Sequence, residues 1–326
     1  MKSPKVYSLL FLFITILLCM PSSIFARAEE KSEETYPLDR DGKIYLQNIS
    51  GDIVVNSWEK NEIKINAIKV ARYEKDLDNV FIDITQTNGT IRIMTRHGQS
   101  FKLFRSTHVS VHYELLIPDN AHLRVESVSG DVDIRDIGGF LEVKTVSGDI
   151  KIITAKDGVK SKTVSGDIYM VKITGNVDIK TTSGEIEIEA INGSIEAETV
   201  SGDINIGAIK GSVEAETVSG DIDLEGFSQA EEIEMETISG DISIQGFLSP
   251  DGMYDLDSHS GQIKVVIPSD SVFELQTKTF SGDIDCDFEL KVSGKIDRKK
   301  IQGVVGKGGA NLNLSTFSGN IQISKR

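Results

Sequence analysis

The residues with the clearest potential for chemistry are aspartates in a repeated phrase, Ser-Gly-Asp-Ile. They are Asp131, Asp149, Asp167, Asp203, Asp221, Asp241 and Asp283. Carboxylates stacked at a regular spacing can bind Ca²⁺, as they do in nonapeptide-repeat proteins. Such sites draw acids from turns on both sides, whereas the opposite turns here read Thr174-Gly175-Asn176 and Asn192-Gly193-Ser194. We therefore interpret the aspartates as turn residues and expect no cofactor, with calcium as the alternative.

A second group of acids lies in the segments that precede the phrase. Alternation of apolar and polar residues places Lys160 and Lys162 outward, then Asp178 and Lys180. Six glutamates follow: Glu196, Glu198, Glu214, Glu216, Glu234 and Glu236. Like charges opposite each other on neighbouring strands are destabilising, so a cation or basic partner would relieve them. These six glutamates are the candidate binding residues of the chain, and we weigh this hypothesis against a solvated face on drifting repeats, which the pattern favours.

Signatures of an enzyme are weak. Ser57 and Lys60 match S-x-x-K, but no helix pattern follows to position the serine. The Gly-rich run at Gly303 lacks the strand–loop–helix setting of a phosphate loop. The histidines are scattered, without the spacing of metal ligands: His97, His108, His112, His122 and His259. The sequence therefore predicts no catalytic residue, no metal site and no enzyme.

The elements that position these residues follow from the repeat. Its glycines recur every eighteen residues and later every twenty or twenty-one, and we predict that they form tight turns: Gly130, Gly148, Gly166, Gly184, Gly202, Gly220, Gly240, Gly261, Gly282 and Gly319. A weaker phrase with Gly175, Gly193 and Gly211 falls halfway. Each half carries the period-two alternation of a half-buried strand. We predict an all-β fold, a single-stranded parallel β-helix (β-solenoid) with about eighteen residues per coil.

Two further columns flank the turns. Continued alternation points a threonine column inward, which favours an internal ladder over an outward ice-binding face: Thr145, Thr163, Thr181, Thr199, Thr217 and Thr237. The next residue is apolar in most copies: Val128, Val146, Val164, Val200, Val218, Ile238, Phe280 and Phe317, with Thr182 and His259 as exceptions. Strict alternation would expose this second column as an interaction stripe. We interpret it as core, because it stays apolar while its neighbours vary.

The chain divides into three parts. Residues 1–28 have the basic, apolar and small-residue regions of a signal peptide, cleaved at Ala28, with lipid attachment at Cys19 as the alternative. Residues 29–125 are expected to form irregular β coils that cap the solenoid, and residues 126–326 the regular solenoid with a closing coil at the C-terminus. Arg96–Thr107 and Asp297–Ala310 break the pattern, and we predict loops there.

Composition narrows the partners and the location. Without the signal peptide Cys286 is the one cysteine, and its place in an alternating segment favours a buried thiol. The 50 acidic residues exceed the 35 basic ones, which argues against nucleic acid as a partner. We expect a monomer that is secreted or extracytoplasmic, in the periplasm or at the cell surface. Its partner would be a cell-envelope component, a surface polymer or a protein.

The iterated "TVSGDI", the early "LQNISGDIVVNSW" and the closing "GKGGANLNLSTFSGNIQI" resemble a bacterial family of putative adhesins with β-strand repeats, whose function is unknown. The resemblance implies a right-handed β-helix in an extracytoplasmic protein. In this chain Glu185, Gln262 and Asn320 replace the aspartate of the phrase. We expect a non-catalytic adhesion, envelope-associated or scaffold protein. The alternative is a secreted polysaccharide-active enzyme, a lyase or hydrolase, on a β-helix.

Overall fold

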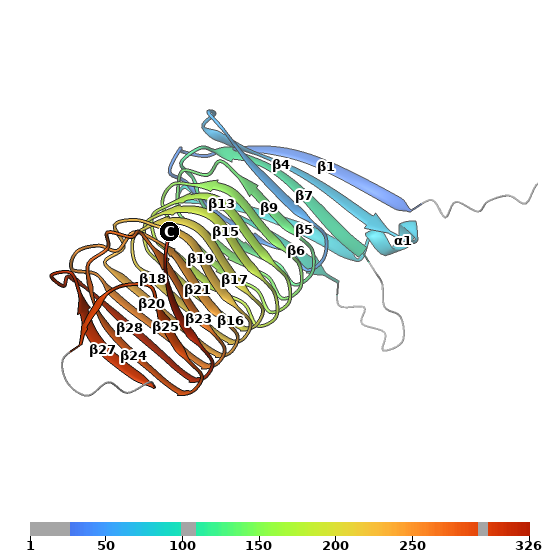
Figure 1. Ribbon diagram of the computed structural model, residues 1–326. Coiled ribbons are helices and arrows are strands. Elements are labelled where there is room, and N and C mark those ends of the chain that lie inside the picture. The colour runs from blue at the N-terminus through green and yellow to red at the C-terminus, as the bar shows by residue number, and fades with distance from the viewer. Residues whose placement is uncertain (1–26, 99–108, 293–298) are drawn as a thin grey trace, which may run out of the picture.

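The computed structural model describes residues 27–98, 109–292 and 299–326, which wind into an elongated β-solenoid (Figure 1). Two long sheets form its opposite walls, with 14 strands in sheet A and 15 in sheet B over the described residues. Most neighbouring strands within each sheet are parallel, and successive coils contribute one strand to each wall. The predicted all-β parallel solenoid with about eighteen residues per coil is confirmed.

Sheet A contains, in spatial order, β1 (Ala28–Pro37), β4 (Glu62–Ala71), β7 (Val109–Pro118), β3 (Ile53–Trp58), β9 (Val132–Arg135), β11 (Ile150–Ala155), β13 (Ile168–Thr174), β15 (Ile186–Asn192), β17 (Ile204–Lys210), β19 (Ile222–Phe227), β21 (Ile242–Gly246), β23 (Ile263–Ile267), β29 (Ile321–Lys325) and β25 (Ile284–Cys286).

Sheet B contains, in spatial order, β26 (Leu290–Val292), β27 (Lys300–Val305), β24 (Phe273–Ser281), β28 (Ala310–Ser318), β22 (Met253–Ser260), β20 (Glu232–Ser239), β18 (Val213–Ser219), β16 (Ile195–Ser201), β14 (Val177–Lys180), β12 (Val159–Lys162), β10 (Leu141–Lys144), β8 (His122–Glu126), β2 (Lys43–Gln47), β6 (Thr90–His97) and β5 (Val80–Thr87). One short helix, α1 (Glu74–Leu77), is present among the described residues.

The core is a stack of apolar residues from alternate positions of the strands. In β17, Ile204 and Ile206 are buried between the sheets while Asn205 faces outward. The register places Ile204 between Ile186 and Ile222 of the adjacent coils, so each inward residue meets its counterpart above and below. One coil cannot bury its apolar side chains alone, and stacking at about 4.8 Å buries them against the next coil.

The corner between sheet B and sheet A needs glycine at the repeated phrase. Gly202 has a φ of +153°, which side chains rarely tolerate, and a Cβ atom there would lie well under 3.0 Å from the carbonyl oxygen of Gly184 in the preceding coil. Backbones of adjacent coils therefore touch directly at this corner. Replacing such a glycine requires the coils to separate.

The threonine column before the corner is buried, as predicted. Thr199, Thr217 and Thr237 donate their hydroxyls to the carbonyls of Gly184, Gly202 and Gly220, at 3.5, 3.2 and 3.2 Å. Each bond joins one coil to the coil before it. In these three coils the column is an internal ladder that ties the corners together, whereas the buried hydroxyls of Thr145, Thr163 and Thr181 make no hydrogen bond to the described residues.

The interpretation of the next column as core is wrong. Its apolar members are between 42% and 70% exposed, because the strand keeps its alternation up to the corner and does not bulge. We name this set the outer apolar column. In spatial order along sheet B it comprises Val128, Val146, Val164, Thr182, Val200, Val218, Ile238, His259, Phe317 and Phe280.

Coils at both ends stack out of sequence order. Strand β28 inserts between β22 and β24, so Gly319 lies against Gly261 on one side and Gly282 on the other. Near the N-terminus β2 likewise lies between β6 and β8, and β3 between β7 and β9. The coil that closes the chain is therefore not the outermost coil of the stack.

Antiparallel strands cover both ends. Strands β1, β4 and β7 pair antiparallel in sheet A, and β5 pairs antiparallel with β6 through a turn at Asn88 and Gly89. The predicted loop Asp297–Ala310 is in part wrong: Lys300–Val305 forms β27, which pairs antiparallel with β24 and β26. Most of the other predicted loop, Arg96–Thr107, lies outside the described residues. So do residues 1–26 of the predicted signal peptide.

No helix among residues 27–98, 109–292 and 299–326 has the length and apolar character needed to span a membrane.

Candidate functional site

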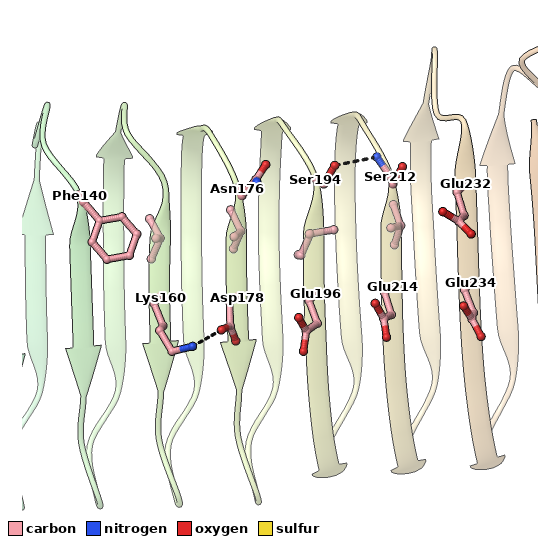
Figure 2. Close-up of a pocket in the computed structure, with 14 residues that line it drawn as sticks. Phe140, Lys160, Asn176, Asp178, Ser194, Glu196, Ser212, Glu214, Glu232 and Glu234 are labelled. Carbon is pink, nitrogen blue, oxygen red and sulfur yellow. Dashed lines mark hydrogen bonds and ion pairs between the residues drawn. The ribbon is translucent and has the colours of Figure 1, made fainter.

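The six predicted glutamates lie together on the outer face of sheet B. Glu196, Glu214 and Glu234 occupy the same position on β16, β18 and β20, and Glu198, Glu216 and Glu236 occupy the position two residues on. Figure 2 shows the first row, with side chains pointing away from the solenoid. The register extends both rows by one coil, to Asp255 and Asp257 of β22. We name these eight residues the acidic block.

Asp255 and Asp257 were missed in the sequence. Their segment reads "MYDLDSHS" in place of the glutamate phrase, and its coil is longer than eighteen residues. The signal that could have found them is the alternation of Tyr254 and Leu256, both buried, with the two acids. Eight carboxylates on four successive strands make the block the densest concentration of like charge that the described strands of sheet B present.

Polar side chains on the neighbouring strands bind carboxylates at each end of the acidic block. Lys180 Nζ contacts Glu196 Oε1 at 2.7 Å and Glu198 Oε1 at 2.6 Å, and these two bonds raise the pKa of Lys180. At the other end Asn313 donates its amide to Asp255 Oδ1 at 2.6 Å. Between these ends the carboxylates face one another at strand spacing.

Burial, followed by repulsion from Glu198 and Glu236, raises the pKa of Glu216 above its ordinary value of 4.5. Glu216 occupies the middle of its row, so it has an acid on each neighbouring strand. The raised pKa shows that the folded protein holds this negative charge at some energetic cost. A cation placed over the row would lower both the cost and the pKa.

A shallow groove of about 520 Å³ runs across the starts of these strands, as Figure 2 shows. Its lining changes from Lys160 and Asp178, which form an ion pair, to Glu196, Glu214 and Glu234. The charge of the face therefore changes sign along the solenoid. The groove is open and has no enclosed space for a small substrate.

The outer apolar column lies on the same face, one outward position beyond the second acidic row. It ends in three rings stacked face to face. His259 and Phe317 have ring centroids 5.0 Å apart, and Phe317 and Phe280 have centroids 4.8 Å apart. Phe317 thus has both ring faces covered by neighbours and presents its edge to solvent. Phe280 at the end of the stack is 70% exposed.

Aspartate side chains of the repeated phrase accept hydrogen bonds from backbone N–H groups of the neighbouring coil. Oδ1 of Asp203 accepts the amide N–H of Asp221 at 2.8 Å, and Oδ1 of Asp221 accepts that of Asp241 at 2.7 Å. Asn320 makes the same bond to Asp283 at 2.9 Å. Each side chain therefore satisfies a donor of the neighbouring coil, which is a structural role. Among the described residues no three His, Cys, Asp or Glu side chains are grouped so that they could hold a metal.

The other reactive residues named in the sequence have structural contacts. Ser57 donates its hydroxyl to the carbonyl of Asp136 at 2.6 Å, away from Lys60. His112 and His122 accept backbone N–H groups through Nδ1, from Asp52 at 3.2 Å and Phe140 at 3.0 Å. His108 lies outside the described residues.

Cys286 is half-buried, and burial raises the pKa of its thiol. A raised pKa reduces the thiolate fraction on which cysteine reactivity depends. The thiol is therefore suited to packing, in agreement with the segment's alternation.

These features define the class: a parallel β-solenoid with a strongly acidic, partly apolar outer face. Solved structures that it resembles include a putative adhesin from Bacteroides fragilis NCTC 9343, at 12% identity over 90% of this chain and 97% of that one, with a TM-score of 0.41. A second is a putative cell adhesion protein from Clostridium sporogenes ATCC 15579, at 9% identity over 91% of this chain and 100% of that one, with a TM-score of 0.20. A third is a putative lipid binding protein from Parabacteroides distasonis ATCC 8503, at 15% identity over 90% of this chain and 97% of that one, with a TM-score of 0.38.

A comparison with curated proteins finds no match. The model of the family described as Toastrack DUF4097 matches residues 42–251 and 230–324, nearly all of the described chain. The protein belongs to this family, and the resemblance found in its sequence is confirmed.

Proposed function

We propose that the protein is a non-catalytic binding protein that acts outside the cytoplasm and engages a component of the cell envelope, a surface polymer or another protein. The observation that carries this proposal is the acidic block, which places eight carboxylates on consecutive strands of a stacked scaffold. A scaffold that holds like charges in register presents a fixed, multivalent surface to a partner of opposite charge.

The contacts of the reactive residues favour binding over catalysis. The hydroxyl of Ser57 and the Nδ1 atoms of His112 and His122 are engaged by the backbone. A nucleophile needs a base within hydrogen-bond reach, and these bonds direct the groups elsewhere. The open groove over the acidic block also suits a long partner that covers several coils better than a small substrate.

The location outside the cytoplasm is supported by the sequence of residues 1–28, with its basic start, apolar run and small residues before Glu29. Retention at the cell through a lipid at Cys19 is the alternative to release. Fractionation of cells that express the full chain, followed by mass measurement of the mature protein, separates the two.

The test is co-sedimentation of the mature protein with isolated envelope fractions and with insoluble polysaccharides, with soluble sugar release assayed in the same tubes. We expect retention by one fraction without sugar release. Sugar release would overturn the proposal in favour of the polysaccharide-active alternative. No retention by any fraction would remove the envelope and polymer partners.

A matched pair of variants assigns the binding to the acidic block. In the first, Glu196, Glu198, Glu214 and Glu216 become Gln. In the second, the same number of acids on the outer face of sheet A become amides: Glu187, Glu189, Asp223 and Glu225. We expect loss of retention in the first variant alone, since both remove four charges but only one alters sheet B.

A further inference from the structure

The outer apolar column and the acidic block lie side by side on sheet B. On β16, β18 and β20 an acid stands two residues before an apolar residue, so both leave the same face, about 6.8 Å apart. The pairs are Glu198 with Val200, Glu216 with Val218, and Glu236 with Ile238. The apolar partners in these pairs are 42–49% exposed. Each coil here thus offers one carboxylate and one apolar side chain to solvent.

The stacked rings leave a sugar polymer little ring face on this column, because the well-exposed ring of Phe280 lies at the end of the stack, two strands beyond the acidic block. Sugar rings bind aromatic side chains through the flat faces of both, and the faces of Phe317 are covered by His259 and Phe280. The rest of the column consists of aliphatic side chains and Thr182. A row of exposed aliphatic side chains is suited to contact with the apolar side chains of a protein partner.

A second copy of the chain fits the charge poorly. The outward positions of β8 to β14 carry five basic residues (Arg124, Lys144, Lys160, Lys162 and Lys180) and three acidic ones (Glu126, Glu142 and Asp178), a net charge of +2. The acidic block carries −8 on the next four strands. Two copies packed with their solenoid axes reversed would set +2 against −8 at each end. Most of the acidic charge would stay uncompensated.

We propose that the acidic block and the adjoining part of the outer apolar column bind a cationic amphipathic α-helix that lies along the solenoid axis. This partner deepens the proposed function, on which the inference rests. A helix with one row of apolar and one row of basic side chains would place the first over Val200, Val218 and Ile238. The second row would then lie over the glutamates beside them, where its positive charges would offset the repulsion between carboxylates on neighbouring strands.

The repeat lengths favour a helix over an extended strand. One helical turn rises about 5.4 Å, and one coil of the solenoid about 4.8 Å. The mismatch is about 0.6 Å per coil and about 2.4 Å over four coils, which is less than half a turn. Same-face side chains of an extended strand recur every ~6.8 Å, so that they lose register by about 8 Å over four coils. Only the helix stays in step with the acidic block along its length.

The test uses a fluorescein-labelled 18-residue peptide of Lys and Leu whose leucines form one helical face. Its binding to the mature protein is measured by fluorescence anisotropy. The control peptide has the same composition in an order without an apolar face. We expect the amphipathic peptide to bind about tenfold tighter than the control, since only it can use both rows.

A matched pair of protein variants separates the apolar contribution from charge. Val218→Thr with Ile238→Thr alters the column beside the acids, and Val146→Thr with Val164→Thr alters it beside the lysines. Thr182 already occupies this column, and its carbonyl accepts the backbone N–H of Ser201 in the next coil, so threonine fits the backbone there. We expect the first pair to weaken peptide binding about tenfold and the second less than twofold.

Three results would overturn the inference. One is equal binding of the two peptides, which would mean attraction by charge alone. The second is an equal effect of the two threonine pairs. The third is a dimer in sedimentation velocity that Val218→Thr with Ile238→Thr abolishes, which would make a second copy the occupant. Should the wild type still sediment with an envelope fraction while the peptide fails to bind, this inference fails and the proposed function stands.

Discussion

Replacing Gly202 by alanine should destabilise the solenoid far more than the same change at Gly89. Both glycines have positive φ, +153° and +70°. An alanine Cβ at Gly89 would have no heavy atom within 4 Å, so the change there costs only the backbone strain, about 1–2 kcal/mol. At Gly202 strain of about 1–3 kcal/mol adds to an overlap with the carbonyl of Gly184, which the coils can relieve only by separating. We expect a total above about 4 kcal/mol.

The assay is denaturant unfolding of Gly202→Ala, Gly89→Ala and wild type, followed by circular dichroism. Because stacked repeats can unfold in parts, hydrogen exchange measured by mass spectrometry should locate the effect. We expect faster exchange in β15 to β19 for Gly202→Ala, and near the β5–β6 turn for Gly89→Ala. Equal unfolding midpoints for the two variants would refute direct backbone contact between coils at this corner.

Three smaller predictions concern single side chains. Glu216→Gln should raise the free energy of unfolding at pH 7 by about 0.5 kcal/mol by removing like-charge contacts. Because the pKa of Glu216 is raised in the folded protein, the wild type should gain the same stability when this carboxylate is protonated, as pH falls through that pKa towards 4.5. Denaturation of both proteins at pH 7 and pH 4.5 should therefore show that the difference between their free energies of unfolding disappears at the lower pH. Asp203→Ala should lose about 1 kcal/mol with the bond to Asp221, while Asp203→Asn keeps it, as urea melts would show. Cys286 should react slowly with a disulfide reagent at pH 8 in the folded protein and quickly in denaturant, and equal rates would contradict the raised pKa of its thiol.

Much of the fold could be predicted because the phrase recurs at nearly constant spacing. Period-two alternation assigns each residue to a face, and a constant spacing assigns each residue a counterpart in the next coil. These two rules place Thr217 inward and Glu216 outward, and they bring Lys180, Glu198 and Glu216 into one row. Both rules depend only on residue spacing, so their predictions hold wherever the coil length is constant.

The order of coils at the ends could not be predicted in this way. Gly261, Gly282 and Gly319 belong to nearly identical phrases, and any of these coils can stack on any other. In the structure Gly319 lies between the other two: β27 runs antiparallel along the outer edge of β24, and the chain then crosses to its inner edge, where β28 lies. Because the phrases are so similar, the sequence does not indicate which coil stacks on which.

The error over the outer apolar column has a different cause. Its constant apolar character suggested burial, whereas alternation from Thr217 to Val218 required exposure. Geometry decides the outcome, since a strand that keeps its hydrogen bonds to both neighbours cannot turn two successive side chains to the same side. Val218 is 42% exposed for this reason, and its apolar character needs an explanation other than the core.

The outward columns are where the function of such a solenoid can be found. Inward positions are fixed by the need to match the coil above and below, and they therefore say little about partners. Outward positions are free to differ from coil to coil. Stacking therefore requires neither the apolar character of the outer apolar column nor the change from Lys180 to Glu198 in the row beside it. Repulsion within the acidic block even opposes stacking. A partner that covers both features would stabilise the coils that carry them, which couples binding to the integrity of the solenoid.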